Sequence, residues 1–468
     1  MFRFIAKKFG TRAKIGQQYF ASFLLVLLVL VSLTASAVAQ KKQIRKGYLL
    51  VQQVATYNAS KYGAISTPEE AEKIFAAIAG KLDGVEFNTL YYADQDIAAH
   101  RAIAKVAQKH GVDLWASTFK LLERNGAFGS ISPEYQAYVM NANGEIIPAM
   151  LNNRPLFDIL NPDAVTWFIG VYKQKYLIPC KGLFNGLFFN EDVIPYLAKW
   201  NNDTRYDYWN NATYSPAVLK LWRQYCIDNK IQIQGRIVDK FPVHKPDLVA
   251  NGSGKTAYYP GYNVPEKIFP GQRFIDLPRA SGVWKSWYDF IGKVFVDNWI
   301  GRMAQAANEV NQDNPNWYGV AYFGLHHWSL PYEEIQASNF TVPAKNRWGA
   351  WGRQRGLDLA KLSQLPEVDI IICETYPPIA GNLELFIREY KRIAVSGNKV
   401  FGLMLHRDDS WVPPMTEEEL RWVVMQRYLP QLIARYPLKN MLPREKNYSA
   451  SIEQYFNSQL AQYRARLK

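Results

Sequence analysis

The sequence predicts a single-domain α/β fold, a (β/α)8 TIM barrel, and three observations support this fold class. Apolar runs rich in β-forming residues alternate eight times with amphipathic stretches of helical periodicity. Such strict alternation implies parallel strands joined by right-handed crossovers, and eight units favour a closed barrel over an open sheet. The sequence contains neither GxGxxG after its first strand nor a P-loop motif, which removes support for nucleotide-binding doubly wound folds. Since no Pro-, Gly- or Ser-rich linker divides the units, we predict one barrel domain over residues 40–440.

The composition excludes several classes of protein. A chain of 468 residues that is 48% hydrophobic is too large and too apolar to be disordered or built on disulfides. Its three cysteines form no CxxC pair, which argues against a zinc ribbon or a thioredoxin-type site. Aromatic residues make up 14% of the chain, which suits a large core, or a surface that stacks on sugars or on single-stranded nucleic acid. The net charge is +14, and it is +9 without the five basic residues of positions 1–39. A charge of this sign favours polyanions without distinguishing among them.

Residues 1–39 are predicted to be an export signal. A basic stretch precedes residues 21–39, which carry no charge, and Ala37-Val38-Ala39 supplies the small residues that a signal peptidase recognises. An uncleaved anchor is the alternative, because an uncharged stretch of this length just spans a bilayer and basic residues follow at once. We therefore expect a secreted or periplasmic protein without a nucleic-acid partner, which contacts a membrane only if this segment is kept.

The predicted strands share an apolar body that ends in polar or aromatic residues. They are expected over residues 47–57, 84–92, 112–120, 186–192, 231–239, 318–328, 368–378 and 399–411. Thr67 with Pro68 is expected to open the first helix, and Gly111 to close the second. The later helices are expected over residues 161–177, 215–230, 283–310, 347–364, 383–397 and 416–436. Long loops follow the third and fifth strands, over 119–161 and 239–282, and residues 441–468 should form a helical extension.

Two glutamates stand out at the predicted carboxyl ends of strands, where a (β/α)8 barrel carries its active site. The apolar run GLFF precedes Asn190-Glu191, and the run DIIIC precedes Glu374. A charge placed at the end of a buried strand is costly unless it is solvated or paired. Glycoside hydrolysis needs two carboxylates around one bond, so we predict Glu191 and Glu374 as catalytic residues. Ion pairs with Arg236 or Arg407 at the rim are the structural alternative.

The other candidate residues are polar or aromatic side chains that we expect to contact substrate around the same rim. They are Glu86, Asn190, Arg236, His326, His327, Trp328, Tyr376, His406, Asp408 and Trp411.

Three short matches, FFNE, IICETY and the Trp411 loop, resemble the clan of retaining (β/α)8 glycoside hydrolases that includes β-galactosidases, cellulases and β-agarases. The resemblance covers residues 47–436, with Asn-Glu on strand four and Glu on strand seven. It implies that Glu191 is the acid/base and Glu374 the nucleophile. It also implies that Asn190 binds the sugar 2-hydroxyl and that Trp411 forms the floor of the neighbouring subsite. The arginine that many members carry near strand two has no match here, where Glu86 and Asn88 stand.

Alternative functions remain open from the sequence. His326, His327, His406 and Asp408 could form a metal site, but adjacent histidines on a strand point to opposite faces. The HxH motif of barrel amidohydrolases is absent from the first strand, so we expect no metal and no cofactor. A non-catalytic carbohydrate-binding barrel would keep the aromatic rings without a working carboxylate pair.

The expected partner is a poly- or oligosaccharide. The +9 charge and basic residues in the fifth loop (Lys245, Lys255, Lys267 and Arg273) predict an acidic or sulfated one. The alternative is that the basic residues are scattered over the outer helices.

Overall fold

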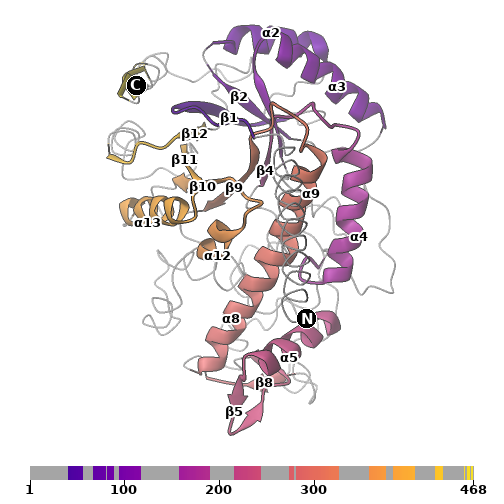
Figure 1. Cartoon of the computed structure of the whole chain (residues 1–468), viewed down its shortest axis with the longest axis vertical. Coiled ribbons are helices and arrows are strands. Elements are labelled where there is room, and N and C mark those ends of the chain that lie inside the picture. Colours follow the sequence, from indigo (N-terminus) through magenta and orange to yellow (C-terminus); the bar gives the residue numbers. More distant parts are fainter. Residues whose placement is uncertain are drawn as a thin grey trace, which may run out of the picture.

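The computed structural model contains a closed barrel of eight parallel strands surrounded by helices (Figure 1). It describes residues 41–55, 67–80, 82–88, 94–117, 158–189, 215–243, 274–278, 281–325, 358–375, 383–405, 427–435, 458, 461–463 and 465–466. Around the ring the strands are β1 (Tyr48–Ala55), β12 (Leu432–Arg435), β11 (Val400–Leu405), β10 (Ile370–Thr375), β9 (Gly319–Leu325), β4 (Gly186–Phe189), β3 (Asp113–Ser117) and β2 (Gly84–Asn88). The predicted (β/α)8 fold class is confirmed.

The predicted fifth barrel strand, residues 231–239, is wrong. This stretch forms an antiparallel hairpin of β5 (Gln232–Ile233) and β6 (Arg236–Ile237), which turns at Gln234 and Gly235 with positive φ. The sequence IQIQGRIVD alternates apolar and polar residues, a pattern of half-exposed antiparallel strands. Buried parallel strands are instead continuous apolar runs, as GLFF is in β4.

The eighth barrel strand is β12, which the sequence analysis placed inside a helix over residues 416–436. Its run LIAR is only four residues long, and in so short an apolar run helical and strand periodicity cannot be separated. The strands predicted as sixth, seventh and eighth are therefore the fifth, sixth and seventh of the barrel. Glu374 thus lies on the sixth barrel strand, and not on the seventh as the resemblance to the hydrolase clan required.

The predicted helix caps are confirmed. Thr67 Oγ1 accepts a hydrogen bond from the Glu70 amide at the start of α2 (Pro68–Ile78), with Pro68 at its first position. Gly111, with φ of +65°, follows the end of α3 (Asp94–Lys109). The other helices that follow or precede barrel strands are α4 (Pro162–Tyr172) with its π-helical continuation η3 (Lys173–Leu177), α5 (Pro216–Asp228), α12 (Leu359–Gln364) and α13 (Leu383–Ser396). Among the described residues, no helix combines the length and apolarity needed to cross a membrane.

One continuous helical run joins α8 (Gly282–Val294), the π-helical η5 (Phe295–Gly301) and α9 (Arg302–Val310). At 1.5 Å per residue it is about 43 Å long. Asn298 and Arg302 donate to the carbonyls of Ile159 and Pro162 at the start of α4, which marks the carboxyl side of the barrel. Because α8 precedes this contact, it extends beyond that side. Figure 1 shows α5, β5 and β8 (Phe274–Asp276), which pairs with β7 (Phe241–Val243), gathered near the far end of α8.

The barrel interior is filled by side chains. Tyr48, Leu50, Trp115, Phe188 and Ile372 belong to its buried cluster. The Trp115 indole occupies the space beside Gly186, where any Cβ atom would overlap the ring. A second, larger cluster packs the outer face of the strands against the helices. The barrel is thus a packed core, and a ligand has to bind at one of its ends.

Cys180, Cys226 and Cys373 are all free and buried, so they form no disulfide with one another. Burial raises the pKa of Cys180 and of Cys226 to about 12. These two thiols therefore stay protonated and unreactive near neutral pH.

Candidate active site at the carboxyl end of the barrel

Four neighbouring strands carry the chain toward most of the predicted site residues. Around the ring these are β4, β9, β10 and β11, which end at Phe189, Leu325, Thr375 and Leu405. The predicted residues that follow them directly lie outside the described residues: Asn190, Glu191, His326, His327, Trp328, Tyr376, His406, Asp408 and Trp411. These four strands are consecutive in the ring of eight, so their carboxyl ends form one continuous half of the barrel rim.

Glu374 is the predicted catalytic residue whose backbone the structure places. It is the second-last residue of β10 and pairs with Leu325 of β9 and Met404 of β11. Ile370 and Ile372 of the same strand belong to the interior cluster. Because residues two apart share a face of a strand, Glu374 occupies the interior-facing register at the carboxyl end.

The fourth and seventh strands of the predicted barrel would face each other across its mouth. The strands β4 and β10 do not, because only β9 separates them. Neighbouring strands lie about 4.8 Å apart, so the two backbones are separated by about 10 Å. Residues at the ends of strands two apart can still share one cleft, since a glutamate side chain spans several ångströms. The predicted pair therefore shares one side of the rim.

Glu86 lies deeper in the barrel than the sequence analysis placed it. A Cβ on Gly84, in the same strand β2, would meet Tyr48 and Trp115 of the interior cluster. Glu86, two residues later, is on the same face and is fully buried, with 0% exposure. The carboxyl group is thus held inside the barrel, two residues before the strand ends.

Arg236 is not at the barrel mouth. It lies on the exposed strand β6 of the hairpin, next to the positive-φ residues Gln234 and Gly235 that make the turn. The sequence analysis placed it at the rim because it treated 231–239 as a barrel strand, and this placement fails together with the strand.

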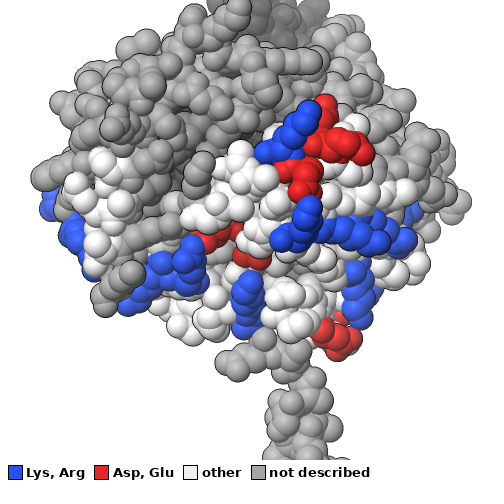
Figure 2. Space-filling view, turned by 90° about the horizontal axis from the view of Figure 1, so that it is seen from above, with Lys and Arg blue, Asp and Glu red and all other residues white. Residues whose placement is uncertain are grey.

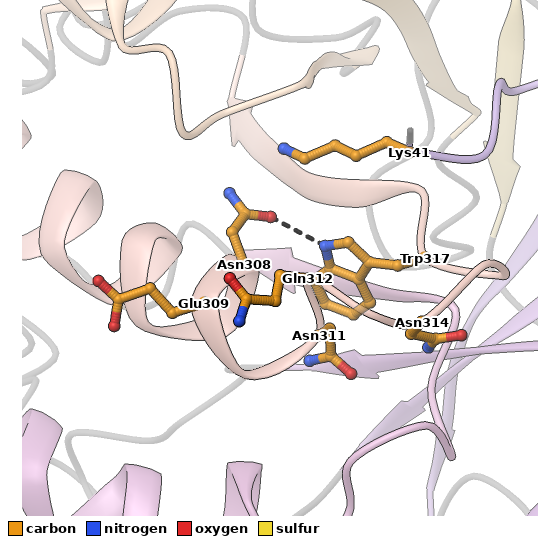
Figure 3. Close-up of a pocket in the computed structure, with 7 residues that line it drawn as sticks. All are labelled: Lys41, Asn308, Glu309, Asn311, Gln312, Asn314 and Trp317. Atoms are coloured by element: carbon orange, nitrogen blue, oxygen red, sulfur yellow. Dashed lines mark hydrogen bonds between the residues drawn. The ribbon is translucent and has the colours of Figure 1, made fainter. Parts of the chain in front are cut away.

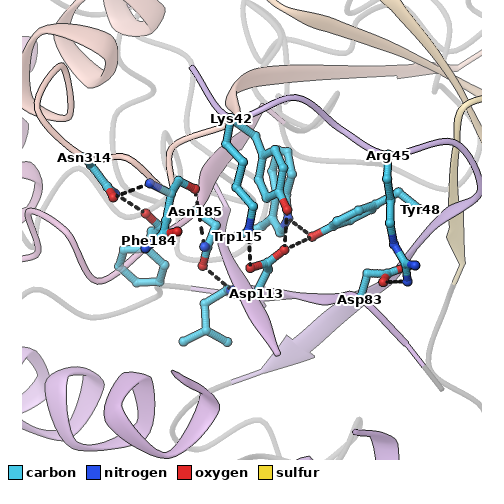
Figure 4. Close-up of polar contacts among 12 residues, drawn as sticks. Lys42, Arg45, Tyr48, Asp83, Asp113, Trp115, Phe184, Asn185 and Asn314 are labelled. Carbon is cyan, nitrogen blue, oxygen red and sulfur yellow. Dashed lines mark hydrogen bonds and ion pairs between the residues drawn. The ribbon is translucent and has the colours of Figure 1, made fainter. Parts of the chain in front are cut away.

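The opposite, amino-terminal end of the barrel is closed by residues 41–48 (Figure 4). Lys41 and Lys42 pair with Asp369 and Asp113 at 2.8 and 3.6 Å, and Arg45 pairs with Asp83. These three carboxylates stand at the start of β10, β3 and β2.

Asp113 is the centre of this closure. It accepts hydrogen bonds from the hydroxyls of Tyr48 and Tyr318 at 3.0 and 2.7 Å. The Trp115 indole donates to the Tyr48 hydroxyl at 2.9 Å and stacks on Tyr318. Burial and the Asp113 carboxylate raise the pKa of both tyrosines, so the phenols remain hydrogen-bond donors. Such a satisfied network at the amino-terminal end is typical of a stabilising contact.

A cavity of about 220 Å³ lies beside this closure (Figure 3). It is lined by Lys41, Asn308, Glu309, Asn311, Gln312, Asn314 and Trp317. Its three asparagines are bound within the protein: Asn308 accepts from the Trp317 indole, Asn311 from the Gly182 amide and Asn314 from the Asn316 amide. Lys41 is held by Asp369. These contacts tie the lining of the cavity to the packing of this end of the barrel.

The basic residues described on the outer helices are interspersed with acids. Lys109 pairs with Glu72 at 2.6 Å, and Lys173 with Glu309 at 2.9 Å. Figure 2 shows the same mixture of signs over the described part of the face seen from above. The four basic residues of the fifth loop that motivated an anionic substrate, Lys245, Lys255, Lys267 and Arg273, lie outside the described residues.

No family model matches the chain, and no curated protein matches it. Solved structures with a similar fold include the PgaB (BpsB) glycoside hydrolase domain from Bordetella bronchiseptica, at 14% identity and a TM-score of 0.43 over 84% of this chain and 94% of that one. They also include PbGH5A, a family 5 glycoside hydrolase from Prevotella bryantii B14, at 8% identity and a TM-score of 0.39 over 91% and 100%. D-allulose 3-epimerase from Methylomonas sp. is similar at 10% identity and a TM-score of 0.38 over 92% and 100%. These structures include two glycoside hydrolases and an epimerase.

Proposed function

We propose that the protein is an exported retaining β-glycoside hydrolase that acts on a poly- or oligosaccharide by double displacement. One observation carries the proposal: Glu374 lies on the interior-facing register at the carboxyl end of a (β/α)8 barrel strand. Asn190-Glu191 follows directly after β4, which is two strands away on the ring. Both glutamates thus follow strands that open on the end of the barrel where this fold carries active sites.

The two glutamates would divide the chemistry between them. Glu374 attacks the anomeric carbon as a carboxylate, while Glu191 donates a proton to the leaving oxygen. Water then attacks the glycosyl-enzyme ester, and Glu191 takes the proton from that water. Asn190 holds the sugar 2-hydroxyl, and Trp411 packs under the neighbouring ring.

Retention requires the two carboxyl groups to approach within about 5–5.5 Å, whereas inversion leaves about 6.5–9.5 Å for a water molecule. Backbones about 10 Å apart allow the shorter distance only if both side chains turn toward each other across β9. The separation is therefore the geometric condition on which the retaining mechanism depends.

Export rests on residues 1–39. Cleavage after Ala39 would leave a chain whose second and third residues, Lys41 and Lys42, already belong to the folded amino-terminal closure. Intact mass of the exported protein tests this, because we expect a chain that begins at Gln40. A mass that includes residues 1–39 would favour the anchor instead.

A panel of neutral and anionic plant and algal polysaccharides tests the activity. We expect the wild-type protein to release reducing sugars from at least one polymer and Glu374→Gln to lose this activity. Glu367→Gln is the matched control, because it neutralises a carboxylate just before the amino-terminal end of the same strand. Equal activity of Glu374→Gln and the wild type would refute the assignment, and so would equal losses in the two variants.

A further inference from the structure

The cavity beside the amino-terminal closure has the size of a site for a small ligand (Figure 3). Lys41 extends along one side of it, and the other lining residues come from the end of α9 and from the loop before β9. Its volume of about 220 Å³ is below the roughly 300–1,000 Å³ of sites for drug-sized ligands. The cavity can therefore hold a molecule about as large as one sugar ring.

Carboxamides are the main polar groups of the lining, and they have hydrogen-bonding capacity to spare. Three of them are held in place by the protein, each through one N–H that donates to a backbone carbonyl and through an oxygen that accepts one hydrogen bond: Asn308, Asn311 and Asn314. A carboxamide has two N–H groups and two lone pairs on its oxygen, so each asparagine retains one of both kinds. The fourth, Gln312, is exposed, and within the described part of the chain its side chain has no hydrogen-bond partner. The lining thus offers fixed donors and acceptors side by side.

The charged groups of the lining are already paired. The Lys41 ammonium contacts both oxygens of the Asp369 carboxylate, at 2.8 and 2.9 Å. One Glu309 oxygen accepts from Lys173 and the other from Gln305, both at 2.9 Å. A charged ligand would have to compete with these contacts. The cavity therefore favours a neutral, polar ligand.

Trp317 supplies an apolar part of the lining. Its indole is buried and donates to Asn308 at 2.8 Å, so the ring has a fixed orientation. Binding sites for small molecules combine such aromatic surface with a few polar groups that orient the ligand. Water also fills polar cavities, but it uses only their polar groups. A sugar ring matches both parts of this lining, because its hydroxyls donate and accept while its C–H groups are apolar.

We propose that this cavity is a second saccharide-binding site, which holds one neutral sugar ring at the amino-terminal end of the barrel. The choice of a saccharide rests on the proposed function, although the site lies at the opposite end of the barrel from the carboxyl end of β10 with Glu374. No bond is made or broken there. A polymer held at this end keeps the enzyme on its substrate and raises the local concentration of glycosidic bonds around it.

Titration calorimetry of the Glu374→Gln variant with D-glucose, D-galactose and D-mannose tests the site without turnover. We expect one of these sugars to bind with a dissociation constant on the order of 1–10 mM, as suits so small a ligand, and its uronate to bind at least fivefold more weakly. Gln312→Ala in the same background should weaken this binding at least fivefold. The control is Gln108→Ala, which removes an exposed glutamine of α3 outside the cavity and should leave the binding within twofold. Binding that Gln312→Ala does not affect belongs to another site.

A second pair of variants tests the other side of the cavity. Lys41→Ala removes a lining residue, whereas Lys42→Ala removes the neighbouring lysine, which pairs with Asp113 and does not line the cavity. Each variant loses one ion pair of the same segment, so only the difference between them reports on the cavity. We expect at least fivefold weaker binding in Lys41→Ala alone. Equal binding in all four alanine variants, or no binding of any sugar tenfold above the expected range, would overturn the proposal and leave water as the occupant.

The outcomes separate this inference from the proposed function. If the wild type hydrolyses glycosides but no sugar binding depends on Gln312, the inference fails and the function stands. If no glycoside is hydrolysed but binding depends on Gln312, the proposed function fails and the site stands. Sedimentation of the Glu374→Gln variant with an insoluble polymer of the sugar that binds distinguishes a polymer unit from a free sugar. Gln312→Ala should lower the bound fraction at least threefold, and an unchanged fraction would overturn the retention of a polymer.

Discussion

Replacing Asp158 with Asn should change how the stability of the protein depends on pH. Burial raises the pKa of this acid from 3.8 to about 6 in the folded chain. The folded state therefore binds the proton more tightly than the unfolded state. The stabilisation is fully present below about pH 4 and is lost as the pH rises through 6. A shift of about two pKa units corresponds to about 3 kcal/mol, and the side chain is fully buried, so solvent screening reduces it little.

The assay is urea unfolding followed by tryptophan fluorescence at pH 4, 5, 6, 7 and 8 at fixed ionic strength. The free energy of unfolding of the wild type minus that of Asp158→Asn should fall by about 2 kcal/mol between pH 4 and pH 7.5, because part of the full change already occurs below pH 4. His100 supplies the opposite control, because burial lowers its pKa from 6.5 to about 4. Its stabilisation is present above about pH 6.5 and is lost as the pH falls toward 4, so His100→Gln should give a difference of opposite slope. Parallel pH curves for Asp158→Asn and the wild type would refute the reasoning.

Three further predictions concern the site and the fold. Glu191→Gln should retain activity on glycosides with good leaving groups, which need little protonation, and lose it on polysaccharides, whereas Glu374→Gln should lose both; equal losses of kcat/KM on the two substrate types in Glu191→Gln would contradict the division of roles. An anionic polymer could bind the basic residues of the fifth loop, which are Lys245, Lys255, Lys267 and Arg273. In that case kcat/KM on a sulfated polysaccharide should exceed that on its desulfated form, and about 0.5 M salt should remove most of the difference. Identical values at about 0.05 and 0.5 M salt would favour a neutral substrate. Asp113→Asn should lower the free energy of unfolding by about 2 kcal/mol, because it removes the pair with Lys42 and weakens two phenol hydrogen bonds, yet leave kcat unchanged; a large loss of kcat in a folded variant would give the amino-terminal end a role in activity.

The parts of the fold that follow from local sequence were predictable. Thr67-Pro68 marks the start of α2, and Gly111 follows the end of α3. Both were predictable because capping depends on residues within one turn. The runs GLFF and IIIC form barrel strands because parallel strands covered by helices are apolar on both faces. Seven of the eight predicted strands are barrel strands, and the count still reached eight because the hairpin at 231–239 was included and β12 was not.

The errors arose where only the period of the hydrophobic pattern distinguishes a buried strand from an exposed one, or a strand from a helix. The alternation in IQIQGRIVD indicated a half-exposed hairpin, and giving it the weight of a buried strand moved each later strand by one place in the barrel. That shift made Glu374 a residue of the seventh strand and strengthened the resemblance to the hydrolase clan. The four-residue β12 carried too short a pattern to be recognised.

Contacts between distant residues could not be predicted from the sequence. Asp158 and Ser215 lie 57 positions apart, and Asp113 and Tyr318 lie 205 apart. Nothing local marks Asp158 as buried or Asp113 as the acceptor of two phenol hydroxyls, since each stands among residues typical of a loop or of a strand start. The carboxylate pair Glu191 and Glu374 stays a prediction, with the backbone of Glu374 placed and Glu191 outside the described residues.

Trapping the covalent intermediate tests the central claim most directly. A 2-deoxy-2-fluoro glycoside with a good leaving group, built on the sugar that the polysaccharide panel identifies, slows hydrolysis of the glycosyl ester. Intact mass spectrometry should then show one added glycosyl unit per chain, and peptide fragmentation should locate it on Glu374. A glycosyl group on another residue, or no adduct on an enzyme that turns over the parent glycoside, would contradict double displacement at Glu374.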